Sequence, residues 1–343
     1  MMKELEQTVL SVKDLHISIG LDEGLLVPVR GVDFSLKANE TLGLVGESGC
    51  GKSLTCKALL GINSKNCKTT GKIDFTDDKG KTMDLLTLKP GSKEIRDIRG
   101  SSIAMIFQEP MSAFSPLYTV GSQLAESARI HLNKSKPEAK KLVLDAMKRV
   151  GIANPEKRFD QHPHEFSGGM LQRALIAMAL ICNPRILIAD EPTTALDVTI
   201  QAQILDLLKQ LQKDFGMSIL YITHDLGTVA QICDRVAVMY LGRIIETGPT
   251  MEIFKNPVHP YTRGLIGSVH KIGGGKERLF SIEGHVPLAM NLDDRCGFYD
   301  RCTFRGAQCL GCDPKLIKVG DDHYAACYLP WEQTIKGEGE SNG

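Results

Sequence analysis

The chain has 343 residues, which is enough for two or three domains with a sizeable hydrophobic core. Its 41 basic and 41 acidic side chains cancel, so the composition indicates neither a nucleic-acid-binding face nor attraction to an anionic membrane. No apolar run approaches the roughly 20 residues of a membrane span, and the polar segment 1–7 lacks a signal-peptide pattern. We therefore expect a cytosolic protein that reaches a membrane only through partner proteins.

A glycine-rich loop near residue 50 is the feature around which the chain is organised. An apolar run over 42–45 precedes the loop and a predicted helix over 53–60 follows it, which is the context that a P-loop requires. Glycines let backbone N–H groups approach a triphosphate, and the helix N-terminus adds partial positive charge. The stretch that we expect to bind ATP is Gly46, Glu47, Ser48, Gly49, Cys50, Gly51, Lys52, Ser53 and Leu54.

Two side chains of this loop have specific predicted roles. We expect Lys52 to reach the β- and γ-phosphates and the hydroxyl of Ser53 to ligate Mg²⁺. The alternative for the same residues is a glycine-rich turn without a ligand, which the complete match to G-x-x-x-x-G-K-[ST] disfavours.

The segments around the loop indicate a mixed α/β domain with an insertion. Alternating apolar residues predict strands over 8–45, and the polar, glycine-containing segment 64–95 suits an antiparallel subdomain with exposed turns. Apolar residues at helical spacing predict helices over 120–132 and 137–150. We interpret these helices as an insertion between strands of the core.

Two weaker motifs lie on either side of this insertion. A predicted strand over 102–107 ends in Gln108, which could reach a magnesium ion but by itself would suit a solvated loop better. Ser167, Gly168 and Gly169 precede a predicted helix over 170–181 and form a second candidate anion site at a helix N-terminus. Ordinary turns use the same residues, so this second motif gains weight only beside the next one.

Acidic residues end a predicted buried strand over 185–189. Asp190 and Glu191 follow its apolar run, and two carboxylates there are costly unless they meet a cation. We expect Asp190 to hold Mg²⁺ and Glu191 to polarise an attacking water. Another predicted buried strand, over 218–223, ends in His224, for which we expect a γ-phosphate contact. Glu191, His224 and Gln108 form the predicted catalytic set.

Together these motifs resemble those of the ATP-binding-cassette (ABC) ATPases over about residues 8–265. The resemblance implies a P-loop, RecA-like core with an antiparallel β-subdomain and a helical subdomain that carries the Ser-Gly-Gly signature. It also implies a head-to-tail dimer, in which Ser167, Gly168 and Gly169 of one subunit cap the γ-phosphate of ATP bound by the other. ATP and Mg²⁺ are the implied cofactors.

A narrower resemblance comes from Asn-Pro-Val-His-Pro-Tyr-Thr at 256–262, which is similar to the C-terminal motif of peptide and nickel importer ATPases. The nearest similarity is to the first of the two ATPase subunits of dipeptide and oligopeptide importers. It implies an ATPase domain over 8–245, with a helical subdomain over about 109–170, and an importer-type extension over 246–334. The tail 335–343 is rich in Gly, Glu, Ser and Asn, and we expect it to be disordered.

The same resemblance implies partners and a location. The expected partners are a second homologous ATPase subunit in a heterodimer, two transmembrane permease subunits and an extracellular solute-binding protein, at the cytoplasmic face of the membrane. ATP-driven closure of the dimer would power peptide import. The alternatives are an importer ATPase for nickel chelates or other solutes, a soluble ABC-type ATPase acting on ribosomes or DNA, and a non-hydrolysing regulatory subunit. The lack of a basic patch argues against the soluble ATPase, and Glu191 with His224 argues against the regulatory subunit.

Half of the ten cysteines lie between residues 296 and 327. Such crowding in a reducing compartment suggests metal ligation rather than disulfides. Four thiolates suit a structural [4Fe–4S] cluster, and tetrahedral Zn²⁺ and unliganded thiols remain as alternatives. The expected ligands are Cys296, Cys302, Cys309 and Cys327, with Cys312 as a possible substitute.

Overall fold

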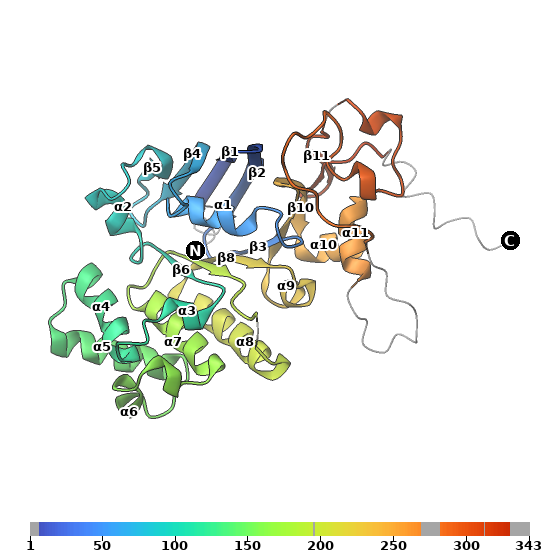
Figure 1. Ribbon diagram of the computed structural model, residues 1–343. Helices are drawn as coiled ribbons and strands as arrows, with labels where there is room; N and C mark the ends of the chain where they lie inside the picture. The colour runs from blue at the N-terminus through green and yellow to red at the C-terminus, as the bar shows by residue number, and fades with distance from the viewer. Residues whose placement is uncertain (1–6, 195, 269–281, 312, 330–343) are drawn as a thin grey trace.

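The computed structural model describes residues 7–194, 196–268, 282–311 and 313–329, and two β-sheets form its framework (Figure 1). The larger sheet has eight strands in the order β11-β12-β10-β9-β3-β8-β7-β6, and the smaller has four in the order β2-β1-β4-β5. The strands are β1 (Thr8–Leu21), β2 (Gly24–Lys37), β3 (Thr41–Val45), β4 (Cys67–Thr76), β5 (Thr82–Asp84), β6 (Ile103–Ile106), β7 (Ile186–Asp190), β8 (Ser218–Thr223), β9 (Arg235–Tyr240), β10 (Arg243–Pro249), β11 (Ile317–Gly320) and β12 (His323–Ala325).

The parallel part of the larger sheet positions the candidate site. β3 pairs in parallel with β8 and β9, and β7 pairs in parallel with β6 and β8. β3, β7 and β8 are buried at every residue, which explains their nearly continuous apolar sequences. Because parallel strands direct their carboxyl ends to one edge, the segments that follow β3, β6, β7 and β8 meet there.

The smaller sheet is antiparallel throughout. Its strands β1 and β2 cover the alternating sequence before the glycine-rich loop, and β4 and β5 come from the polar segment 64–95. The turn between β4 and β5 is exposed, as the polar composition predicted.

The helices lie on both sides of the larger sheet, with α4, α5 and α6 grouped beyond its β6 edge (Figure 1). α4 spans the predicted residues, and α5 begins one residue before its predicted start, where the Glu138 carboxylate accepts from Ser135 N at 2.9 Å. The helices are α1 (Lys52–Leu59), α2 (Lys93–Ile98), α3 (Pro110–Ala113), α4 (Val120–Leu132), α5 (Lys136–Arg149), α6 (Pro155–Phe159), α7 (Gly168–Leu180), α8 (Val198–Phe215), α9 (Leu226–Ile232), α10 (Thr250–Lys255) and α11 (Pro260–Gly267), with 3₁₀ turns η1 (Leu85–Thr87), η2 (Pro163–Glu165), η3 (Tyr299–Arg301) and η4 (Ala307–Cys309).

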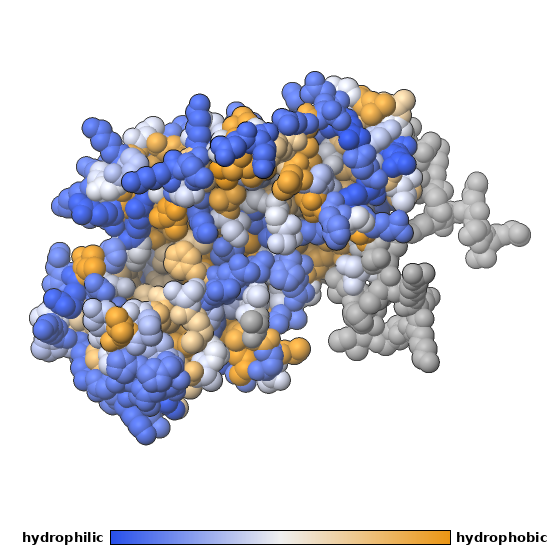
Figure 2. Space-filling model, in the orientation of Figure 1, coloured by the Kyte–Doolittle hydropathy of each residue, from blue (hydrophilic) through white to orange (hydrophobic). Residues whose placement is uncertain are grey.

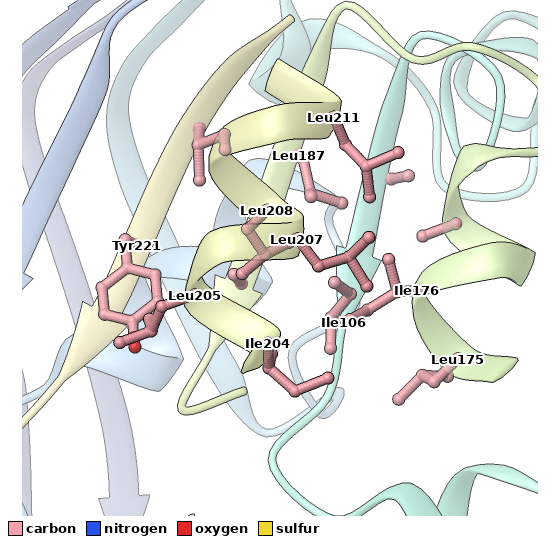
Figure 3. Packing of buried hydrophobic residues seen from close by; sticks show 14 of the residues in the cluster. Ile106, Leu175, Ile176, Leu187, Ile204, Leu205, Leu207, Leu208, Leu211 and Tyr221 are labelled. Atoms are coloured by element: carbon pink, nitrogen blue, oxygen red, sulfur yellow. The ribbon is translucent and has the colours of Figure 1, made fainter. Parts of the chain in front are cut away.

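One large apolar cluster joins α7 and α8 to the sheet (Figure 3). Ile176 of α7 and Leu208 of α8 lie beside Ile106 and Leu187, which belong to the parallel strands β6 and β7. All four side chains are fully buried. This packing fixes the helix that the Ser-Gly-Gly motif begins against the strands that carry the acidic residues.

The C-terminal segment extends the larger sheet. β12 pairs antiparallel with β10, and β11 pairs with β12. The fully buried carboxylate of Glu246 accepts from Val258 N and His259 N at 2.7 and 2.9 Å and lies 2.8 Å from His323 Nε2. One buried acid therefore ties β10, the approach to α11 and β12 together. The predicted boundary between 245 and 246 falls inside β10.

The predicted disordered tail 335–343 lies outside the described residues. Within the described ranges, every helix is too short or too polar to traverse a lipid bilayer.

Candidate nucleotide site

The glycine-rich loop runs from the end of β3 to the start of α1, where a side chain could not be accommodated at two positions. A Cβ at Gly46 would lie 2.2 Å from Met239 O, and one at Gly51, where φ is +100°, would lie 2.3 Å from Pro28 O. Both glycines are therefore required by close backbone approaches. These contacts seat the loop against β2 and β9.

Lys52 closes the loop on itself. Its ammonium donates to Gly46 O at 2.7 Å and to Glu47 O at 2.9 Å, and the side chain is buried. Burial raises the pKa of the neighbouring Cys50 thiol, which lies 3.7 Å from the ammonium, so this thiol is neutral. The loop thus presents one fixed positive charge at the N-terminus of α1, as a phosphate-binding loop requires.

Ser53 and Asp190 join the loop to the end of β7. Ser53 Oγ donates to Asp190 Oδ1 at 3.1 Å. Burial raises the pKa of Asp190, although the hydrogen bond from Ser53 opposes this shift. A buried carboxylate beside a serine hydroxyl offers the oxygen ligands that Mg²⁺ prefers, and a cation would offset the cost of burying the acid.

The Glu191 carboxylate receives three hydrogen-bonding groups. Gln108 Nε2 and Thr194 Oγ1 each donate to Oε2 at 2.9 Å, and His224 Nδ1 lies 3.1 Å from Oε1. Burial acts to raise the pKa of Glu191, but the hydrogen bonds from His224 and Thr194, with the charges of His224 and Lys52, hold it below the ordinary range of a glutamate. The structure therefore brings the predicted catalytic residues together as an ionised carboxylate with its partners.

Backbone geometry also singles out Glu191. Its φ is +47°, in the left-handed region that non-glycine residues seldom adopt, and its N–H donates to Ile222 O of β8 at 2.9 Å. Such a conformation persists when the surrounding structure fixes it, and it occurs often at functional sites. Sequence reasoning missed Thr194, although it stands three residues after Glu191 in the same turn.

The Ser-Gly-Gly motif lies at the N-terminus of α7, apart from the P-loop. Ser167 caps α7, with its hydroxyl accepting from Met170 N at 3.4 Å, and Ser167 and Gly168 are exposed. A Cβ at Gly169 would lie 2.9 Å from Ile200 Cγ2, so the motif packs beside the start of α8. The structure does not bring it to the P-loop of the same chain.

Two side chains from the C-terminal part of the chain reach the P-loop, and sequence reasoning did not predict either contact. Tyr261 Oη accepts from Glu47 N at 2.9 Å. Arg301 donates to both oxygens of the Glu47 carboxylate, at 2.7 and 3.0 Å. Tyr261 stands inside the 256–262 motif that pointed to the family, whereas no local sequence signal marked Arg301.

The four predicted cluster ligands come from one part of the extension. Cys296 N donates to Cys309 O at 2.9 Å, and burial, with smaller contributions from Cys309, Asp313 and Cys327, raises the pKa of Cys296 to about 12. Burial also raises the pKa values of Cys302 and Cys327, each with a smaller contribution from Cys309. Among the described residues, however, no three His, Cys, Asp or Glu side chains are arranged to ligate a metal ion. The ligand set stays a prediction, and Cys312 lies outside the described residues.

Two family models match the chain. One, described as "ABC transporter", matches residues 29–194, and the other, described as "Oligopeptide/dipeptide transporter, C-terminal region", matches 245–309.

Similar proteins include transport ATPases and solved cassettes. The dipeptide transport ATP-binding protein DppD of Bacillus subtilis is 48% identical over 325 residues, which cover 94% of this chain and 95% of the relative. The oligopeptide transport ATP-binding protein OppD of Haemophilus influenzae is 43% identical over 324 residues, covering 94% and 98%. A dimeric ATP-binding cassette solved in a post-hydrolysis state with ADP and Pi has a TM-score of 0.61 at 25% identity, covering 70% of this chain and 98% of its own. The cbiO1 protein of Clostridium perfringens, part of the transporter complex cbiONQ, has a TM-score of 0.60 at 30% identity, covering 73% and 92%.

Proposed function

The chain belongs to the ABC transporter family and is an ATP-hydrolysing subunit of a peptide importer, and we propose that the loop 46–54, Asp190, Glu191, Gln108 and His224 form its hydrolytic site. The observation that carries this proposal is the Glu191 carboxylate, which is held by three side chains at the edge of the sheet where the P-loop lies.

The residues of the hydrolytic site have three separate roles, which are binding the triphosphate, binding Mg²⁺ and orienting the attacking water. Lys52 and the N–H groups of the loop hold the triphosphate, while Ser53 and Asp190 offer oxygen ligands to Mg²⁺, with Gln108 within reach of the same edge. When bound, Mg²⁺ neutralises charge on the β- and γ-phosphates. Glu191, kept ionised by its hydrogen bonds, accepts a hydrogen bond from the attacking water and orients it.

A second ATPase subunit completes the site. Ser167, Gly168 and Gly169 are placed at an exposed helix N-terminus beside α8 and cannot serve the P-loop of their own chain. In a head-to-tail dimer their N–H groups cap the γ-phosphate held by the partner. The partner is a homologous but different chain, so the working unit is a heterodimer.

The remaining partners are two transmembrane permease subunits and an extracellular solute-binding protein, and the ATPase binds at the cytoplasmic face of the membrane. Exposed apolar side chains in the segment that follows Gln108 support this docking. Met111, Leu117 and Tyr118 are each more than half exposed, and Figure 2 shows apolar residues interrupting a hydrophilic face near α3. The ATPase domain spans 8–245, with its helical subdomain over about 109–170, and the importer-type extension spans 246–334.

The extension carries a structural [4Fe–4S] cluster on Cys296, Cys302, Cys309 and Cys327. Cys309 and Cys327 contribute to the raised pKa of Cys296, and Cys302 and Cys309 contribute to that of Cys327, which supports the proximity of these half-buried thiols. The cluster would tie together loops with few buried apolar residues. Zn²⁺ on the same thiols is the alternative.

Reconstitution with the partner subunits tests the transport function. The chain is co-expressed with its permeases and second ATPase, placed in lipid vesicles and supplied with the solute-binding protein loaded with a labelled dipeptide. We expect peptide uptake that requires ATP and is lost with Glu191→Gln. Uptake of a nickel chelate but not of peptides would instead establish the alternative substrate class.

A further inference from the structure

Glu47 of the P-loop is held at its backbone N–H, its backbone carbonyl and its carboxylate. Its N–H donates to Tyr261 Oη at 2.9 Å, its carbonyl accepts from Lys52 at 2.9 Å, and its carboxylate receives both Arg301 nitrogens. Two of these partners lie more than 200 residues away in the C-terminal part of the chain. We propose that Arg301 and Tyr261 are positioning residues for the P-loop, so that the C-terminal extension sets the affinity for ATP; the proposal rests on the nucleotide site described above.

The Arg301–Glu47 contact is a paired, mostly buried interaction. The distances are 2.7 and 3.0 Å, and the side chain of Arg301 is only 6% exposed while that of Glu47 is 32% exposed. Bidentate arginine–carboxylate pairs combine strength with fixed orientation. The pair therefore restrains both the position and the direction of the Glu47 side chain.

Arg301 is itself fixed by other contacts. Its Nε donates to Glu283 O at 2.9 Å, Nη2 donates to Gly284 O at 3.2 Å, and the guanidinium lies over the rings of Tyr240 and Phe298 at 5.8 and 5.9 Å. A cation with so many contacts keeps one geometry. The restraint that it exerts on the P-loop is consequently a rigid one.

Tyr261 is anchored in the same aromatic group. Its fully buried ring lies 4.7 Å from that of Tyr240 and 5.5 Å from that of Phe298, measured between centroids. β9 supplies Tyr240, α11 supplies Tyr261, and the residue directly before η3 is Phe298. The hydroxyl that receives Glu47 N–H is thus set by the packing of three elements.

Charge gives the pair a second role. Glu47 is an acid in the loop that receives a triphosphate, so an unpaired carboxylate there would repel the ligand. Arg301 neutralises this charge without occupying the loop. ATP affinity should therefore depend on Arg301 both through geometry and through charge.

The turn that carries Arg301 is fastened to the body of the protein. Tyr299 N donates to Cys296 O at 2.9 Å, and Gly297 N donates to the Asp313 carboxylate at 2.8 Å. Asp313 in turn pairs with Arg30 of β2 and Arg243 of β10 at 3.2 and 3.1 Å. The turn therefore transmits the position of the extension to the P-loop.

The test measures ATP affinity of the full chain by calorimetry. We expect Arg301→Met to weaken ATP binding roughly tenfold, because the binding-competent loop geometry becomes a minor population and the acid is unpaired. Adding Glu47→Gln to that variant should restore part of the affinity, because it removes the unpaired charge but does not restore the lost contact. Arg305→Met, at an exposed arginine of the same extension, should leave the affinity unchanged. In the assembled transporter, Arg301→Met should raise the KM for ATP and leave kcat near the wild-type value.

Tyr261→Phe keeps the ring and removes only the hydroxyl, so it tests the proposal even if Arg301→Met does not fold. We expect a weakening of a few-fold in ATP affinity with a nearly unchanged Tm. Wild-type affinity in Tyr261→Phe and in folded Arg301→Met would overturn the proposal, as would a failure of Glu47→Gln to rescue affinity. Normal ATP affinity in Lys52→Ala would instead refute the nucleotide site itself, which separates the two failures.

Discussion

Glu191 Oε1 lies 3.1 Å from Nδ1 of His224, and this contact joins the ends of two neighbouring parallel strands, β7 and β8. Gln108, which follows β6, donates to the other oxygen of the same carboxylate. The Glu191 carboxylate thus connects the ends of three adjacent strands, β6, β7 and β8, at the edge of the sheet where the P-loop lies.

Replacing Glu191 by Gln should separate binding from turnover. The amide cannot accept a proton from water, so we expect turnover of the assembled transporter to fall about 100- to 10,000-fold, the usual range for a general base. ATP affinity should stay near the wild-type value because Lys52 and Ser53 remain. ATPase assays and calorimetry measure the two quantities, with Glu126→Gln, an exposed glutamate of α4, as the control. Turnover within a few-fold of wild type would exclude the role assigned to Glu191.

Lys52→Ala should act on binding itself. The buried ammonium is the fixed positive charge of the loop, and its loss should weaken ATP binding by at least about tenfold. Lys65→Ala, at an exposed position after α1, removes the same charge away from the loop and should have little effect. An unchanged dissociation constant for Lys52→Ala would contradict the P-loop assignment.

Protein stability should fall in mild acid because of His259. Burial lowers the pKa of this residue to about 4, so the folded protein holds it neutral while the unfolded chain binds a proton below about pH 6.5. The contribution of neutral His259 to the free energy of unfolding is complete above pH 6.5. It is lost as the pH falls towards 4, and the total loss is about 3 kcal/mol at most.

Thermal unfolding as a function of pH measures this loss. In the wild type, His259 Nδ1 caps α11 by accepting from Tyr261 N at 3.0 Å. The asparagine of His259→Asn can still cap the helix, but an asparagine side chain does not titrate. The stability of this variant should therefore vary less between pH 6.5 and 4 than that of the wild type. Equal slopes for the two proteins would show that His259 is not the titrating group.

Hydrolysis should require a second, different ATPase subunit. The exposed Ser167 motif lies beside α8, so an isolated chain lacks a cap for the phosphate at its own P-loop. We expect the purified chain to hydrolyse ATP far more slowly than the complex, and addition of the partner ATPase to restore the rate. Full activity of the chain alone, at concentrations where light scattering finds a monomer, would refute this expectation.

The cysteines of the extension can be tested by metal analysis. Anaerobically purified protein should be brown, with about four irons and four sulfides per chain, as a Cys₄-bound cluster requires. Cys302→Ser should lose the colour and make the extension more sensitive to protease, whereas Cys182→Ser, a half-buried cysteine after α7, should retain both properties. Stoichiometric zinc without acid-labile sulfide would establish the zinc alternative.

The sequence by itself determined the local features of this protein. The P-loop needs eight consecutive residues, and its glycines were predicted to leave room for a triphosphate. The structure adds that Gly46 and Gly51 also allow close approaches by Met239 O and Pro28 O. The strands before Asp190 and His224 were recognisable because buried parallel strands are apolar at nearly every position. Helix limits were also close, since capping residues and apolar spacing act within one or two turns.

Only the tertiary structure decided which distant groups meet. Gln108 and His224 reach Glu191 from the ends of two other strands, and Arg301 reaches Glu47 across 254 positions of sequence. Such contacts depend on the order of the strands in the sheet and on the pairing of β12 with β10. Short-range sequence propensities determine neither of these long-range arrangements. Short stretches of sequence therefore determine the chemistry of each motif, whereas the restraint of the P-loop by the extension arises from long-range packing.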